Sequence, residues 1–175
     1  MKEIMGGEDL HNALIALGER LRTRTDIVVG GAGALILTGE LPRATSDFDV
    51  LHSDPDIGRL QEDIRAVADR LDLTPGWLNG SIQTYLDVLP PDYRARLITL
   101  PARGKLHIAL LHRQDIMVMK LFAGRPRDLS DVVTLRPTPQ EFQFVRSELP
   151  RLGRIDPARA SRLESFLDQY HDDKQ

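Results

Sequence analysis

The sequence predicts an α/β fold in which a small mixed sheet is flanked by helices and followed by a helical C-terminal part. Two kinds of segment support this prediction. Short apolar runs typical of strands occur at 26–29, 48–51, 96–100 and 105–110. Segments with apolar side chains at helical spacing lie before, between and after these runs. The chain has 175 residues, enough to bury a core, and its 41% hydrophobic and 28% charged residues are typical of a globular protein.

The N-terminal segment is predicted to form a helix, a strand and a second helix. Leucines recur at spacings of four, three and four within residues 8–22, as in an amphipathic helix. The run at 26–29 ends at Gly30-Gly31, and the apolar segment AGALILTG follows. Glycine permits a sharp turn and a close approach of ligand to backbone, and free amides at a helix start hold anions. The glycine pair therefore predicts either an anion site or a purely structural turn.

Asp47 and Asp49 flank Phe48 at the start of the next predicted strand. Residues i and i+2 of a strand project from the same face, so both carboxylates would lie together while Phe48 enters the core. A cation between two carboxylates removes their repulsion, and an oxygen-only ligand set favours Mg²⁺ or Mn²⁺ over zinc. The pattern predicts a divalent metal site at Asp47 and Asp49. The alternative is a strand cap beside an exposed acid.

These residues resemble the first motif of a known superfamily. The matching positions are Gly30, Gly31, Arg43, Thr45, Asp47 and Asp49, with an apolar helix after the glycines. This pattern is similar to the signature of the nucleotidyltransferases related to DNA polymerase beta. More narrowly, it is similar to the bacterial AbiEii-type and related uncharacterised families, and the resemblance covers about residues 27–135.

The resemblance implies a nucleotidyltransferase fold and a role for each matching residue. The glycine turn, with Arg43 and Thr45, is expected to bind a nucleoside triphosphate. Asp47 and Asp49 are expected to be catalytic and to hold two metal ions. Metals so placed would activate an attacking hydroxyl and neutralise the departing pyrophosphate. The serine that usually follows the glycines is absent, because Ala32 stands at that place.

The middle of the chain contains a helix, a turn-rich segment and a candidate third carboxylate. Residues 56–71 have the apolar spacing of an amphipathic helix. Trp77 follows among turn residues, where a core position is favoured over stacking on a base. Superfamily members commonly have a third acid on a neighbouring strand. The candidate here is Asp87, whose surroundings fit either a strand or a turn.

Residues 96–100 and 105–110 are predicted to form an antiparallel hairpin, and residues 114–123 a helix. Lys120 lies inside this apolar helix. Its side chain is expected either to extend along the packed surface to water or to reach into a cleft.

Asp128 and Asp131 follow Arg127 with the spacing of one helical face. Lys120 followed by Arg-Asp-x-x-Asp is similar to the second motif of the AbiEii-type families. The resemblance implies that Lys120 meets the nucleotide phosphates and that one of the two acids, with Asp131 preferred, supports catalysis. The alternative is a helix-start acid with local ion pairs.

The C-terminal part is predicted to be helical. Thr138-Pro139-Gln140-Glu141 is a capping box that begins one helix, which ends before Pro150, and Asp156-Pro157 begins the last. We expect residues 1–135 to form a nucleotidyltransferase-like domain and residues 136–175 a helical extension packed on it as one compact unit.

The amino-acid composition excludes several kinds of functional site and indicates a class of partner. The absence of cysteine excludes disulfides, thiolate zinc sites and cysteine nucleophiles. The N-terminus lacks the features of a signal peptide and no segment is long and apolar enough to span a membrane, so a cytoplasmic protein is expected. Residues 101–162 carry 12 basic and 6 acidic side chains, whereas residues 1–100 carry 10 and 16. This basic second half predicts contact with polyphosphate or RNA, or simply a solvated helical surface.

The sequence therefore predicts a metal-dependent nucleotidyltransferase that moves a nucleoside monophosphate from a nucleoside triphosphate to an acceptor hydroxyl. The resemblance to AbiEii-type proteins implies RNA, such as a tRNA end, as acceptor, a toxin-antitoxin context and a cognate antitoxin as partner. Two alternatives stay open. One is a non-catalytic nucleotide- or partner-binding module of antitoxin or regulatory type, and the other is nucleotidyl transfer to a small molecule.

Overall fold

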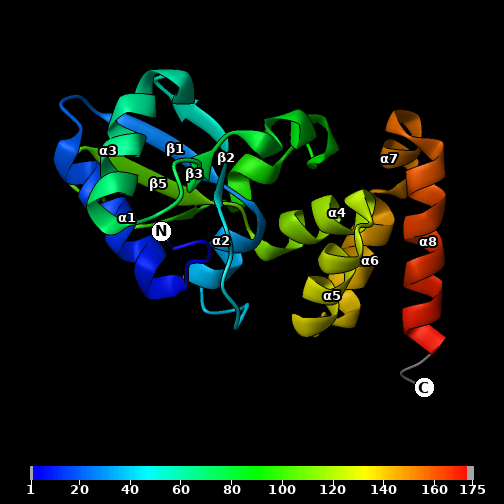
Figure 1. The fold of residues 1–175 in the computed structure, drawn as a ribbon. Helices are drawn as coiled ribbons and strands as arrows, with labels where there is room; N and C mark the ends of the chain where they lie inside the picture. The colour runs from blue at the N-terminus through cyan, green and yellow to red at the C-terminus, as the bar shows by residue number, and fades with distance from the viewer. Residues whose placement is uncertain (1, 173–175) are drawn as a thin grey trace. The chain divides into compact units, whose positions relative to one another are not determined.

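The computed structural model describes residues 2–172 and confirms the α/β fold (Figure 1). Its five-stranded mixed sheet has the order β3-β2-β1-β5-β4. Contacts divide the described residues into two compact units, residues up to 86 with 95–111, and residues 87–94 with those from 112 onward. The sheet belongs to the first unit and a group of helices to the second. The predicted domain division after residue 135 stays a prediction.

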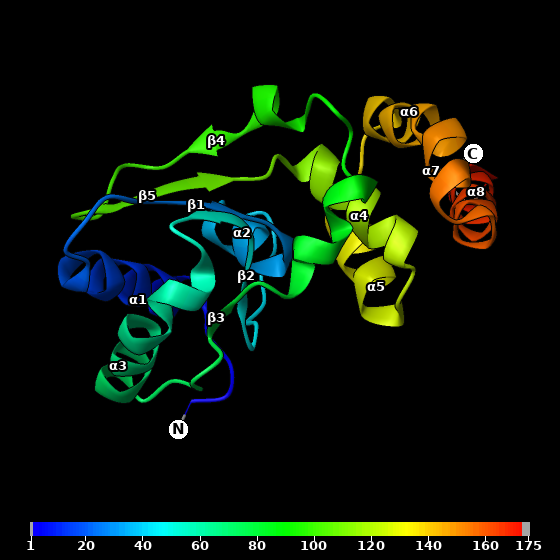
Figure 2. The ribbon, with the colours of Figure 1, turned by 90° about the horizontal axis from the view of Figure 1, so that it is seen from above.

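The first unit holds the sheet and three helices. Its elements are α1 (Gly7–Arg20), β1 (Thr25–Val29), α2 (Gly31–Leu37), β2 (Phe48–Asp54), the 3-10 segment η1 (Ile57–Leu60), α3 (Gln61–Leu71), β3 (Leu78–Asn79), β4 (Ile98–Thr99) and β5 (Leu106–Leu110). Helix α1 contacts both α2 and α3. Figure 2 shows α1 and α3 together on one side of the sheet.

The sheet is mixed because β1 pairs antiparallel with β2 and parallel with β5. The predicted hairpin is confirmed, since β4 and β5 pair antiparallel. Strands β1 and β5 bury alternate residues, and their register places the buried positions side by side, Ile27 beside Ile108 and Val29 beside Leu110. Residues that are paired in register project from the same face of a sheet. The buried side chains of β1 and β5 therefore line one face, which forms the core, and the other face is only half-buried.

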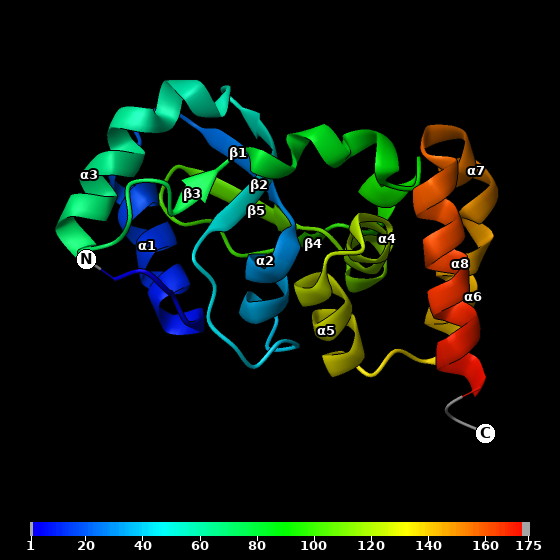
Figure 3. The same cartoon turned by 45° about the vertical axis from the view of Figure 1, so that its right-hand side comes forward.

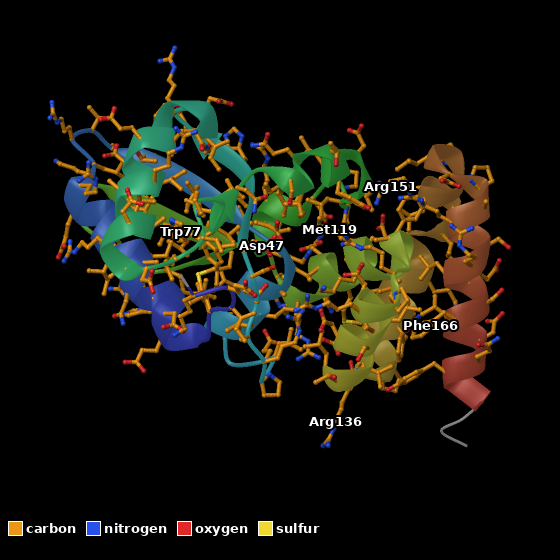
Figure 4. All side chains as sticks on the ribbon, in the orientation of Figure 1. Asp47, Trp77, Met119, Arg136, Arg151 and Phe166 are labelled. Carbon is orange, nitrogen blue, oxygen red and sulfur yellow. The ribbon has the colours of Figure 1, made fainter. Side chains whose placement is uncertain are left out.

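Trp77 anchors this core, as predicted. Its side chain is fully buried, and its indole Nε1 donates a hydrogen bond of 3.1 Å to the Ile64 carbonyl in α3. A buried indole keeps its polar group satisfied in this way. The same segment brings the chain alongside β2, because the Phe48 amide donates to the Trp77 carbonyl and β3 then pairs parallel with β2. Figure 4 shows Trp77 inside the first unit.

The second unit consists of helices α4 (Arg113–Ala123), α5 (Pro126–Thr134), α6 (Pro139–Ser147), α7 (Leu149–Ile155) and α8 (Pro157–Asp172). Helix α4 is buried from Asp115 to Phe122 and contacts α5, α6 and α8, so it is central to this unit. Figure 3 shows α6, α7 and α8 grouped together. The predicted capping box at Thr138 and Glu141 is present.

Helix α7 was not predicted. Pro150 indicated the end of the preceding helix, and α6 does end before it at Ser147. Proline is tolerated in the first turn of a helix, where its missing N–H has no intrahelical partner, and Pro150 occupies that turn of α7. Within α7, Arg151 donates to the carbonyls of Asp87 and Val88 at 2.8 and 2.6 Å, which ties residues 87–94 to the second unit (Figure 4).

Among residues 2–172, no helix combines the length and the apolar character needed to cross a bilayer.

Candidate functional site

Asp49 is the second residue of β2 and lies between two fully buried side chains, Phe48 and Val50. Because side chains alternate along a strand, Asp49 projects from the opposite, half-buried face. Asp47 comes one residue before the strand and is also half-buried (Figure 4). Phe48 thus enters the core as predicted, while a carboxylate is presented on the half-buried face of the sheet.

The glycine turn packs directly against Asp49. The Gly30 amide donates a 3.0 Å hydrogen bond to the Asp49 carbonyl, and Gly31 follows with a φ of +63°. A Cβ at Gly31 would lie 2.6 Å from Asp49 Oδ2, closer than such atoms approach. Gly31 is therefore required both by its left-handed backbone and by the carboxylate beside it.

Helix α2 is held at this short distance from β2 by Gly33. A Cβ there would lie 2.2 Å from the ring of Phe48, so only a residue without a side chain lets the helix approach the strand. The turn, the helix and the strand predicted from the first motif therefore form one tightly packed unit around Asp49.

Thr45 and Arg43 fix the loop that leads into β2. Thr45 is buried and exchanges two backbone hydrogen bonds with Met5, of 2.6 and 2.9 Å. Its hydroxyl donates to Asp47 Oδ1 at 3.4 Å, and Arg43 Nη1 donates to the Ala44 carbonyl at 2.8 Å. The structure thus joins Thr45 to Asp47, and Gly30 and Gly31 to Asp49.

Ser81 is a contact of Asp49 that the sequence did not indicate. Its hydroxyl donates a 2.7 Å hydrogen bond to Asp49 Oδ1. Asn79 lies beside Asp49 in the parallel register of β3 and β2, and its Oδ1 accepts from the Ser81 amide at 2.8 Å. The sequence predicts a turn at Asn79-Gly80. It does not predict β3, because a strand of two residues is too short to show an alternation of polar and apolar side chains.

The second motif forms a buried cluster within the second unit. Lys120 Nζ in α4 lies 2.9 Å from Asp128 Oδ1 and 2.8 Å from Asp131 Oδ2, both in α5. Arg125 Nε lies 2.6 Å from the other oxygen of Asp128. The side chains of Lys120 and the two acids are all less than a tenth exposed. The local ion pairs considered as the alternative for these acids are therefore present, and they are buried rather than exposed.

Asp87 does not lie on a strand. It is an exposed residue of the 3-10 segment η2 (Ser81–Val88), so the strand interpretation of this segment is wrong and the turn interpretation is right. The contacts assign Asp87 to the second unit. Among residues 2–172, no group of three or more His, Cys, Asp or Glu side chains is arranged to hold a metal ion.

Asp26, on β1, is paired with a neighbouring cation. Arg24 donates to both of its carboxylate oxygens at 2.7 and 2.8 Å, which lowers the pKa of Asp26 below its ordinary value of 3.8. Its pairing with Arg24 marks Asp26 as a surface ion pair, and we place it outside the candidate site.

The carboxylates of Asp47 and Asp49 are oxygen donors of the kind that suits a hard divalent cation such as Mg²⁺ or Mn²⁺. Asp49 lies beside the glycine turn. Searches of the curated proteins and of the solved structures found no match to the chain. A family model described as "nucleotidyltransferase of unknown function (DUF6036)" matches residues 9–136, which include both motifs. The chain therefore belongs to this family of nucleotidyltransferases.

Proposed function

We propose that the protein transfers a nucleoside monophosphate from a nucleoside triphosphate to an acceptor hydroxyl, with Mg²⁺ or Mn²⁺ as cofactor. Membership of a nucleotidyltransferase family supports the reaction class. The observation that carries the assignment of the site is the position of Asp49, whose Oδ2 lies 2.6 Å from where a Cβ of Gly31 would be. A phosphate bound at this glycine turn would be a neighbour of the Asp49 carboxylate, and a cation between the two anions would remove their repulsion.

Asp47 and Asp49 would hold this cation. It would activate the attacking hydroxyl and neutralise charge on the departing pyrophosphate. Gly30 and Gly31 would let the triphosphate approach the backbone. Thr45 would keep Asp47 in place through its hydroxyl, which contacts Asp47 Oδ1.

The remaining predicted site residues have proposed roles of their own. Arg43 would bind nucleotide as a guanidinium suited to phosphate oxygens. Lys120 and Asp131 would act together, the ammonium meeting the phosphates and the carboxylate holding the ammonium, a pair joined at 2.8 Å.

RNA, such as a tRNA end, is the acceptor that the charge distribution favours. The side chains of four exposed arginines of the second unit make no hydrogen bond or ion pair with the described residues 2–170: Arg127, Arg136, Arg154 and Arg162. Figure 4 shows Arg136 pointing away from the end of α5. Cations without partners suit an anionic acceptor better than a cationic small molecule. A toxin-antitoxin context, with a cognate antitoxin as a protein partner, is the further proposal that the resemblance of the two motifs to AbiEii-type proteins would imply.

A transfer assay tests this function. The protein is incubated with Mg²⁺ or Mn²⁺, each of the four α-labelled nucleoside triphosphates and total RNA, and the label is followed into RNA, small molecules and protein. We expect label in RNA, and none after chelation of the metal. If triphosphate binds measurably but no label moves from any nucleotide, the non-catalytic binding module is correct and the enzyme is not. Label in a small molecule alone would identify the other alternative.

Replacing Gly31 with alanine is expected to disrupt the metal site, and Gly39→Ala provides the matched control. Both glycines have a positive φ, +63° and +76°, so each alanine should cost about 1–2 kcal/mol of folding free energy. Only at Gly31 would the new Cβ meet Asp49, because nothing lies within 4 Å of that position at Gly39. We expect Mn²⁺ affinity, measured by calorimetry, to fall more than about tenfold in Gly31→Ala alone. Equal affinities in the two variants would contradict the site.

A further inference from the structure

We infer that Ser81 is a positioning residue for Asp49, and that it holds the carboxylate in the orientation needed at the proposed metal site. The inference rests on the proposed function and extends it to a residue outside both sequence motifs. The Ser81 hydroxyl donates to Asp49 Oδ1 at 2.7 Å, although the two residues are 32 positions apart in the chain. A hydroxyl donor and a carboxylate acceptor at this distance form a strong, charge-assisted hydrogen bond.

Ser81 is itself held in place by the end of β3. Asn79 in β3 is paired in register with Asp49 in β2. Ser81 follows Asn79 by two residues, so the pairing of these strands brings the Ser81 hydroxyl to Asp49. Asn79 Oδ1 accepts from the Ser81 amide at 2.8 Å, and Asn79 Nδ2 donates to the Gly76 carbonyl at 3.3 Å. Such an Asx turn fixes the backbone two residues on, and here that residue carries the hydroxyl.

The hydrogen bond restricts how the Asp49 side chain can turn. With Oδ1 directed to Ser81, Oδ2 is directed to Gly31, where a Cβ would lie 2.6 Å away. A carboxylate that a hydroxyl fixes in one rotamer binds a cation without first losing rotational freedom. Ser81 lies outside the first motif, so this hydroxyl reaches Asp49 from a different segment of the chain.

Four variants test the inference. Ser81→Ala removes the hydroxyl, Ser81→Thr keeps it, and Asn79→Ala removes the acceptor that orients Ser81. Ser161→Ala is the matched control, an exposed serine of α8 whose hydroxyl makes no hydrogen bond among residues 2–172. Two properties are measured without substrate: the χ1 rotamer of Asp49 in metal-free protein, from three-bond NMR couplings, and the affinity for Mn²⁺ alone, by calorimetry. Transfer is then assayed as a function of Mn²⁺ concentration.

Wild type, Ser81→Thr and Ser161→Ala should show a single Asp49 rotamer. Ser81→Ala should show averaged couplings, an Mn²⁺ affinity lower by about tenfold and a matching rise in the Mn²⁺ needed for half-maximal transfer. Asn79→Ala should show a smaller change in the same direction. A single Asp49 rotamer with unchanged Mn²⁺ affinity in Ser81→Ala would overturn the inference. Label transferred to Ser81 itself would also overturn it, because the hydroxyl would then be an acceptor.

The same measurements separate this inference from the proposed function. If Ser81→Ala frees the Asp49 side chain but wild type neither binds Mn²⁺ nor transfers nucleotide, the orienting hydrogen bond stands and the nucleotidyl-transfer site is refuted. If wild type binds Mn²⁺ and transfers nucleotide while Ser81→Ala behaves like wild type in all three measurements, the site stands and Ser81 has no part in it.

Discussion

Replacing Asp49 with asparagine is expected to abolish metal-dependent nucleotide transfer while leaving the fold intact. Asparagine has the same shape and can still accept a hydrogen bond from Ser81, but it lacks the negative charge that would bind the cation. If the cation stabilises the transition state by about 4 kcal/mol, the rate should fall about 1000-fold. Transfer and Mn²⁺ affinity are measured side by side, with circular dichroism to verify the fold.

The matched control is Asp54→Asn, a charge removal at the opposite end of β2. Asp54 is exposed and lies beside Asp26 in the register of β1 and β2, away from the glycine turn. It should leave both transfer and Mn²⁺ affinity within about twofold of wild type, since a surface charge of this kind contributes little. An unchanged metal dependence in Asp49→Asn would refute the assignment of Asp49, whatever the control shows.

Replacing Lys120 with methionine is expected to destabilise the protein by about 3–5 kcal/mol, because two buried carboxylates then lose their shared cation. The Lys120 ammonium lies within 2.9 Å of Asp128 and of Asp131, and all three side chains are less than a tenth exposed. Arg125 would still pair with Asp128, which limits the loss at that carboxylate. Urea unfolding measures the loss, and a midpoint equal to that of wild type would contradict the role of the buried ion pairs.

A triple variant separates the structural role of Lys120 from its proposed contact with phosphate. Lys120→Met combined with Asp128→Asn and Asp131→Asn removes the buried carboxylate charges together with the lysine, and should recover most of the lost stability. Full transfer activity in the stable triple variant would limit Lys120 and Asp131 to a structural role. Loss of transfer with stability restored would support their part in nucleotide binding.

The local structure around the first motif was largely predictable. Three consecutive segments form this part: the apolar run at 26–29, the glycine pair and the apolar helix. Each can be predicted from residue types and spacings within a few positions of the chain. The i, i+2 spacing likewise predicted that Phe48 enters the core while its neighbours do not. What could not be predicted is how short segments pair. Strand β3 has two residues, too few for any periodicity, and η2 has an apolar character that fits a strand equally well.

For the second motif too, the sequence predicted the local structure but not the contacts between segments. Helical spacing put Asp128 and Asp131 on one face, and both lie on α5 as expected. Their burial against Lys120 depends on α4, which is surrounded by other helices of its unit. Spacing along one helix does not reveal which neighbour covers it, so the sequence did not predict that these ion pairs are buried.

By itself the sequence determined the nucleotidyltransferase class, the order of helices and strands around the glycine turn, and the two aspartates proposed to hold a metal. The tertiary structure alone decided what surrounds Asp49: Gly31 against one carboxylate oxygen and the Ser81 hydroxyl on the other. The physical reason is the separation along the chain between the residues that interact. Turn chemistry and side-chain alternation act between residues a few positions apart, whereas the contact between Ser81 and Asp49 exists only because β3 pairs in register with β2.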